Sequence, residues 1–195
     1  MNIRLVLSAF VLSALFLALN SCSKKHPHLT EVATLDSLMQ EVQLAKLTFD
    51  SLDASKVEEQ LGQINRDVKK LQSIVGVTLT KEEAGFFNDY NNTKRLIKDF
   101  PDQYRRIEKE LARTTVQLSQ LKEALKKQAT VDGSGNEISE EYVKKQMKAE
   151  GNVASHLIEE IEEMAVRVKK ANARFENESP QATAYLNGWT SNTNE

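Results

Sequence analysis

The fold is decided by residues 86–125, FFNDYNNTKRLIKDFPDQYRRIEKELARTTVQLSQLKEAL. Within this stretch an apolar residue, a tyrosine or a threonine recurs at alternating steps of four and three residues. These positions are Phe86, Tyr90, Thr93, Ile97, Phe100, Tyr104, Ile107, Leu111, Thr114, Leu118, Leu121 and Leu125. Such spacing places one continuous stripe on a single face of an α-helix. The stretch therefore predicts a long amphipathic helix.

Two local signals bear on the course of this helix. Thr80-Lys81-Glu82-Glu83 matches a capping box, in which the first and fourth residues each bond the other's backbone N–H. Pro101 lies in the middle of the stripe, where its missing N–H and its ring bend a helix. Because the stripe keeps its phase across Pro101, we expect one kinked helix of about 50 residues, with a tight restart at Pro101 as the alternative.

Residues 30–75 carry two shorter stripes that do not join in phase. The first consists of Leu35, Leu38, Val42, Ala45, Phe49 and Leu52, and the second of Val57, Leu61, Ile64, Val68, Leu71 and Val75. On a straight helix the step from Leu52 to Val57 would rotate the stripe by about 140°, so we expect a break near Asp53–Ser55. Ser55-Lys56-Val57-Glu58 is then predicted to be the capping box of the second helix.

A last long helix is predicted over residues 139–178. The turn-rich stretch TVDGSGN, residues 130–136, reverses the chain, and Ser139 can cap the helix that follows. Pro180 is expected to end the helix. Its stripe consists of Val143, Met147, Glu150, Ala154, Leu157, Ile161, Met164, Val168, Ala171 and Phe175. Glu150 either fixes the register of packing or lies at a frayed, exposed stretch near Gly151, and we favour the exposed alternative.

Further apolar residues flank these stripes, namely Leu44, Leu47, Phe87, Leu96, Val153 and Ile158. They widen each stripe beyond a two-stranded contact, so that a helix can touch two neighbours. The predicted fold is therefore all-α, an elongated antiparallel helical bundle or coiled coil of three long arms. The arms cover residues 30–75, broken near Asp53–Ser55, residues 80–129, kinked at Pro101, and residues 139–178. The bundle domain as a whole covers residues 30–178.

The first 21 residues have the composition of a targeting segment. Arg4 is followed by LVLSAFVLSALFLAL, residues 5–19, which is shorter than the ~20 residues of a bilayer-spanning helix. Leu19-Asn20-Ser21-Cys22 resembles the lipobox of bacterial lipoproteins, although Asn20 stands where a smaller residue is usual. The resemblance implies that residues 1–21 are a cleaved signal peptide. An uncleaved membrane helix and an ordinary secretory signal are the alternatives.

The resemblance also implies a lipid on Cys22, the only cysteine of the chain. In such lipoproteins the thiol carries a diacylglycerol through a thioether, and the freed amino group is acylated, for example with palmitate. Residues 22–29 would form a lipidated tether that holds the bundle at a membrane. In Bacteroidota lipoproteins, which this signal resembles, export to the cell surface usually follows acidic residues after the cysteine. Ser23-Lys24-Lys25 lacks them, so we expect an outer-membrane position facing the periplasm.

Composition and motifs give no indication of an enzyme. The 26 basic and 28 acidic residues nearly balance, which gives no reason to expect nucleic acid as a partner. No phosphate loop, nucleophile elbow or nucleotide fingerprint is present. We therefore predict no enzymatic activity, no catalytic residue, no cofactor and no small-molecule substrate.

The candidate metal ligands are also weak. His26 and His28 flank a proline in the tether, and His156 has no second histidine nearby. Asp132, Ser134 and Asn136 imitate the start of a calcium loop, but the glycine and the final glutamate of an EF-hand are missing from the expected positions. A plain turn and a solvated linker are the better interpretations, and no metal site is predicted.

The acidic run Glu159-Glu160-Ile161-Glu162-Glu163 could suggest a di-metal site. Bundle sites of that kind pair a glutamate with a histidine three residues later, and no glutamate here has one. We expect Ile161 to lie in the stripe and the acids to be solvated, balanced by Lys169 and Lys170 further along.

Residues 179–195 form a polar tail in which Tyr185 and Trp189 are four apart. If the tail were helical, the two rings would share a face and could dock a protein partner. They could equally fold back over the end of the bundle.

The function expected from the sequence is a lipid-anchored helical scaffold or adaptor of the cell envelope. It would bind an unidentified protein partner through the bundle surface and the membrane through the lipid on Cys22. A periplasmic holdase-type chaperone is the alternative, and it would need an exposed apolar strip. A cell-wall-associated enzyme is a third, less favoured possibility.

Overall fold

The computed structural model describes residues 27–74 and 78–192. The secondary structure of this part is helical apart from one isolated bridge between Val131 and Glu137. Its helices are α2 (Leu29–Asp50), α3 (Ala54–Ser73), α4 (Lys81–Ile97), α5 (Phe100–Lys126) and α6 (Glu140–Asn192). The predicted signal peptide (residues 1–21), Cys22, His26 and Val75 lie outside the described residues.

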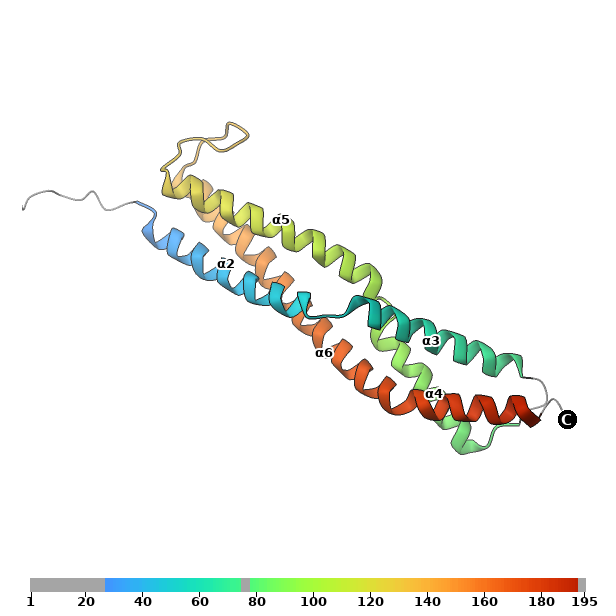
Figure 1. The fold of residues 1–195 in the computed structure, drawn as a ribbon. Coiled ribbons are helices and arrows are strands. Elements are labelled where there is room, and N and C mark those ends of the chain that lie inside the picture. Colours follow the sequence, from blue (N-terminus) through green and yellow to red (C-terminus); the bar gives the residue numbers. More distant parts are fainter. Residues whose placement is uncertain (1–26, 75–77, 193–195) are drawn as a thin grey trace, which may run out of the picture.

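The helices pack into an elongated rod (Figure 1). The chain runs along the rod through α2 and α3, returns through α4 and α5, and runs forward again through α6, which spans the full length. At one end α2, α5 and the first part of α6 pack together, and we call this the α2–α5 half. At the other end α3, α4 and the last part of α6 pack together, and we call this the α3–α4 half. The prediction of an all-α bundle is confirmed.

The core of the rod is made of the predicted stripes. Every described residue of the four stripes is buried or half-buried. Of the flanking residues, Phe87 is buried and Leu96 and Ile158 are half-buried. Leu44 and Leu47, however, are 57% and 56% exposed, and Val153 is exposed too. The prediction that these three widen the stripes is wrong, because their positions around the helix face away from the neighbouring helices.

The chain between α2 and α3 leaves the helical conformation at residues 51–53. Asp53 caps α3, since its Oδ1 accepts a hydrogen bond of 2.9 Å from the Lys56 N–H. The prediction that Ser55 is the cap is therefore wrong by two positions. Aspartate and serine are comparable cap residues, so composition alone did not choose between them.

The capping box predicted at Thr80 is confirmed. The Glu83 N–H donates to Thr80 Oγ1 at 3.2 Å, and the Thr80 N–H donates to Glu83 Oε2 at 2.8 Å. Further along, Lys98 and Asp99 separate α4 from α5. Pro101 lies in the first turn of α5, where the missing N–H has no intrahelical partner to lose. The predicted arm of residues 80–129 is thus divided into two helices, α4 and α5. This corresponds to the alternative of a tight restart at Pro101 and not to one kinked helix.

The cap at Ser139 is present, but the end predicted at Pro180 is not. The Tyr142 N–H donates to Ser139 Oγ at 3.2 Å. At the other end, α6 continues through Pro180 to Asn192, so the prediction that Pro180 ends this helix is wrong. An internal proline costs about 3 kcal/mol. Ala182 and Leu186 are buried beyond it, and the burial of such apolar side chains offsets that cost.

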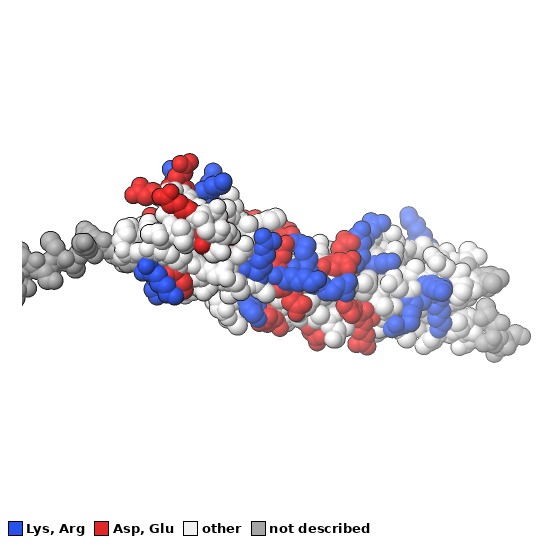
Figure 2. Space-filling view, turned by 90° about the horizontal axis from the view of Figure 1, so that it is seen from above, with Lys and Arg blue, Asp and Glu red and all other residues white. Residues whose placement is uncertain are grey.

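Charged residues cover the outside of the rod. On the face shown in Figure 2, acidic and basic side chains are interspersed along the length, with acidic residues gathered near the turn between α5 and α6. Basic side chains lie close together near the middle of this face, with acidic side chains beside them. A charge pattern of this kind keeps a helical surface solvated.

Candidate functional site

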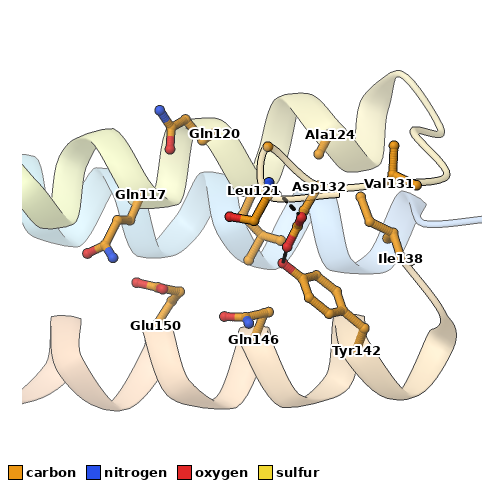
Figure 3. A pocket seen from close by; sticks show the side chains of 12 residues that line it. Gln117, Gln120, Leu121, Ala124, Val131, Asp132, Ile138, Tyr142, Gln146 and Glu150 are labelled. Atoms are coloured by element: carbon orange, nitrogen blue, oxygen red, sulfur yellow. Dashed lines mark hydrogen bonds between the residues drawn. The ribbon is translucent and has the colours of Figure 1, made fainter. Parts of the chain in front are cut away.

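The turn between α5 and α6 covers a pocket of about 310 Å³ (Figure 3). One wall comes from α5 through Gln117 and Gln120, and the opposite wall from α6 through Gln146 and Glu150. Side-chain amides and one carboxylate can donate and accept hydrogen bonds, so the pocket suits polar groups. Glu150 is half-buried on an unbroken part of α6, and the prediction that it lies at a frayed, exposed stretch is therefore wrong.

Asp132 holds this turn together through its carboxylate. Its Oδ1 accepts from the N–H groups of Ser134 and Asn136, each at 2.8 Å. Its Oδ2 accepts from Asn136 Nδ2 and from the Tyr142 hydroxyl, each at 2.9 Å. The hydrogen bonds from Asn136 are the main cause that lowers the pKa of Asp132 to about 2. The two oxygens of this carboxylate accept four hydrogen bonds, which hold the turn in place. This agrees with the interpretation of the stretch as a plain turn.

The segment between α5 and α6 contains two left-handed residues, Gln128 with a φ of +51° and Gly135. Gly135 has a φ of +84°, a conformation that residues with a Cβ rarely adopt. It lies between Ser134 and Asn136, whose N–H groups both point to Asp132. Glycine at this position therefore lets the chain reverse tightly over the pocket.

Tyr185 and Trp189 lie on α6 in the α3–α4 half and share a face. Their rings stack with centroids 5.5 Å apart and an interplanar angle of 11°. Trp189 also contacts Phe87 at 5.6 Å, and Tyr185 contacts Phe86 at 5.5 Å. The two residues thus pack against the end of the bundle, as in the fold-back alternative, and their use in docking a partner stays a prediction.

The interior of the α3–α4 half contains buried polar bonds. The hydroxyl of the fully buried Tyr90 donates to Asp67 Oδ2 at 2.8 Å. Burial, followed by this hydrogen bond to a carboxylate, raises the pKa of Tyr90. Nearby, the buried Thr93 donates to Glu178 at 3.0 Å, which ties α4 to α6. These contacts hold helices in place through specific hydrogen bonds.

The acidic run on α6 is only partly solvated. Ile161 is buried in the stripe, as predicted. Glu160, however, forms a two-pronged pair with the guanidinium of Arg106 at 2.7 and 3.1 Å, and this hydrogen bonding is the main cause that lowers the Glu160 pKa. The Arg106 guanidinium on α5 thus balances the charge of Glu160. The predicted balance by Lys169 and Lys170 stays a prediction.

Within residues 27–74 and 78–192, no group of three or more histidine, cysteine, aspartate or glutamate side chains could hold a metal ion. His156 is exposed, with its Nε2 4.0 Å from Glu160. Within the same ranges, none of the helices combines the length and the hydropathy needed to cross a bilayer.

The chain was compared with protein-family models, with curated proteins and with solved structures, and no match was found in any of the three comparisons.

Proposed function

We propose that the protein is a lipid-anchored scaffold or adaptor of the cell envelope that binds a protein partner through its bundle surface. The observation that carries this proposal is where the rod begins. Helix α2, whose first residue is Leu29, begins at one extremity of the rod (Figure 1). Only residues 23–28 separate it from Cys22, and the seven steps from Cys22 to Leu29 span at most about 25 Å. A lipid on Cys22 would therefore hold that extremity close to a bilayer.

The rest of the rod would project from the membrane. We treat it as three arms, formed by α2 with α3, by α4 with α5, and by α6. The 53 residues of α6 correspond to a length of about 80 Å. The α3–α4 half would be the far end, and the long sides between the two ends would be available to a partner. We place the anchor in the outer membrane, facing the periplasm, because Ser23-Lys24-Lys25 lacks the acidic residues of exported lipoproteins.

The distribution of exposed apolar residues favours a defined partner over many unfolded clients. A holding chaperone needs a wide apolar strip. In the part of the chain that the structure describes, the large apolar side chains that are exposed are Leu29, Leu44, Leu47, Val116, Val131, Val153 and Val166. They are spread over α2, α5, the turn and α6, with only Leu44 and Leu47 one helical turn apart on α2. The scaffold is therefore the better supported function.

Chemical cross-linking in the native host tests the proposal. We expect the wild-type protein to capture one or a few envelope proteins reproducibly. The Cys22→Ser variant, which cannot form the thioether, should capture them less well because it is no longer held at the membrane. Recovery of no specific neighbour would contradict the scaffold. Suppressed aggregation of several unrelated unfolded proteins would support the chaperone instead.

A further inference from the structure

A groove follows the contact between α3 and α6, beside the break that separates α2 from α3. It consists of two hollows of about 290 and 670 Å³. Both hollows are lined by Lys56 and Glu176, so they adjoin each other. These two side chains form an exposed ion pair of 3.0 Å that lies where the hollows meet. The groove is therefore a continuous feature of one long side of the rod.

Each hollow contains a side-chain amide whose buried oxygen has no hydrogen-bond partner in the described part of the chain. In the smaller hollow it is Oε1 of Gln60, a residue that is only 3% exposed. In the larger hollow it is Oδ1 of Asn172, a half-buried residue. A buried oxygen without a donor destabilises the folded state, because it has lost its hydrogen bonds to water. Two such oxygens lie in one groove, and a ligand with hydrogen-bond donors would satisfy both.

Pro180, which lines the smaller hollow, leaves one backbone carbonyl of α6 without its usual hydrogen-bond donor. In an unbroken helix the N–H of residue 180 would bond the carbonyl of Glu176, but proline has no N–H. The Glu176 carbonyl therefore lacks the donor that residue 180 would supply, and Glu176 is one of the residues that line both hollows. Acceptors on α6 and an acceptor on α3 thus lie along the same groove.

The remaining lining indicates an uncharged ligand with some apolar surface. Asp53, Glu59 and Glu176 line the groove together with Lys56 and Lys169, so its charges nearly cancel. Apolar surface comes from Phe175 and Pro180 in the smaller hollow and from Leu52, Ala165 and Val168 in the larger one. A peptide backbone meets these requirements, because each unit carries one N–H donor and one C=O acceptor and no charge. A side-chain amide, which has both groups as well, can pair with such a unit.

We propose that this groove binds an extended, uncharged peptide segment of the protein partner, with the amides of Gln60 and Asn172 hydrogen-bonded to the peptide backbone. The proposal rests on the proposed function, since it gives the scaffold's partner a chemistry and a place. Main-chain hydrogen bonds would supply affinity, as they do when other proteins bind extended peptides.

A blocked oligoalanine peptide is the probe for the first test. Titrated in millimolar excess into the isotope-labelled protein, it should shift the NMR signals of the Gln60 and Asn172 side-chain amides. An analogue of equal length with ester linkages, which lacks backbone N–H groups, should shift them far less. Equal shifts with the ester analogue, or no shift with the peptide, would overturn the proposal.

Gln60→Met is the matched variant, because methionine has a similar length and forms no comparable hydrogen bond. We expect it to weaken peptide binding about tenfold, the effect of one lost hydrogen bond to a buried group. Its melting temperature should stay the same or rise, since an unpaired buried amide is removed. Gln40→Met, at an exposed position of α2, should leave binding unchanged. A lower melting temperature with wild-type peptide affinity would show that Gln60 is only structural.

Cross-linking in cells separates this proposal from the scaffold itself. If wild-type protein captures a partner and Gln60→Met captures it equally well, the groove is not the docking site and the scaffold stands. If the variant loses a partner that the wild type and Gln40→Met retain, the groove is the docking site. If the wild type captures nothing specific, the scaffold fails irrespective of the groove.

Discussion

The two halves of the rod share one helical spacing but are stabilised in different ways. In the α2–α5 half the buried side chains are mostly aliphatic and form one continuous cluster, which includes Leu35, Val42, Ile107, Leu111, Leu118, Leu157 and Ile161. In the α3–α4 half the cluster is smaller and contains Ile64, Phe87, Tyr90, Ala182 and Leu186, with half-buried rings around it. The first half is held mainly by aliphatic burial, with one ring stack of Phe49 on Tyr104, and the second mainly by aromatic contacts and buried hydrogen bonds.

This difference shows that apolar periodicity fixes where a helix packs without fixing what stabilises the contact. Burial of aliphatic surface is non-directional, so the stabilisation of that half depends on the area buried and on close packing more than on the orientation of single groups. The Tyr90–Asp67 bond and the stack of Tyr185 on Trp189 depend on orientation. We therefore expect single substitutions to have distinct signatures in the two halves.

The largest effect is expected for Leu118→Ala, in the centre of the α2–α5 half. Leu118 is fully buried, and its truncation should lower the free energy of unfolding by about 2–5 kcal/mol through lost burial and a cavity. Urea denaturation followed by circular dichroism measures the change. Val116→Ala, on the exposed face of the same helix, should change stability far less, and equal losses would show that this half has no packed core.

A smaller effect is expected for Tyr90→Phe in the α3–α4 half. Removing the hydroxyl leaves the Asp67 carboxylate without this donor, and should cost about 1–3 kcal/mol. Tyr104→Phe is the matched change near the α2–α5 half, where the ring stacks on Phe49 at 4.3 Å, and it should cost less. If Tyr104→Phe were the more destabilising, the contrast between the halves would be wrong.

Tyr90→Phe also has a pH signature. Because burial raises the Tyr90 pKa, the folded state favours the neutral phenol more than the unfolded state does. The resulting stability is complete below the pKa of the unfolded chain and is lost as pH rises above it. Tyr90→Phe should flatten part of this alkaline fall in the free energy of unfolding, which denaturation at a series of alkaline pH values measures. An unchanged fall would mean that Tyr90 ionises as freely in the folded protein as in the unfolded chain.

The N-terminal caps of α3 and α4 should each contribute about 1 kcal/mol to the free energy of unfolding. Thr80→Ala removes the capping box of α4, and Asp53→Ala removes the cap of α3, each at a cost of about 0.5–2 kcal/mol. Ser55→Ala is the control, since Ser55 is exposed and the cap lies at Asp53. A loss at Ser55 as large as that at Asp53 would place the start of α3 where the sequence predicted it.

The smallest effect on the rod as a whole is expected for the turn at Asp132. Hydrogen bonds lower its pKa to about 2, so the stability that they give is present above the ordinary aspartate pKa and is lost as pH falls towards 2. The NMR signals of the Ser134 and Asn136 N–H groups should titrate in that acidic range and not near pH 4. In Asp132→Asn they should not titrate there, while circular dichroism stays near that of the wild type.

Much of the fold could be predicted from the sequence because the stripes are long and regular. The positions from Phe86 to Leu125 keep their phase throughout, and each of them is buried or half-buried. The Thr80 capping box is a local signal and was confirmed. The continuation past Pro180 could not be predicted locally, because it depends on Ala182 and Leu186 packing against the rest of the α3–α4 half.

The candidate sites were less predictable than the fold. Gln60 lies beside a predicted stripe, and nothing in its residue type indicates burial. The pair of Arg106 with Glu160 joins residues 54 positions apart, so it depends on how two helices align. The aromatic pair Tyr185 and Trp189 was found from spacing alone, but its packing partners on α4 were not. Sites formed between helices thus require the three-dimensional arrangement.

The most direct measurement for the anchored rod is mass spectrometry of the protein purified from its native host. The proposal predicts a mature chain that begins at Cys22 and carries a diacylglycerol on its sulfur and an acyl chain on its amino group. Detection of a free thiol at Cys22, or of residues 1–21 still attached, would contradict the anchor and with it the proposed place of the rod at a membrane.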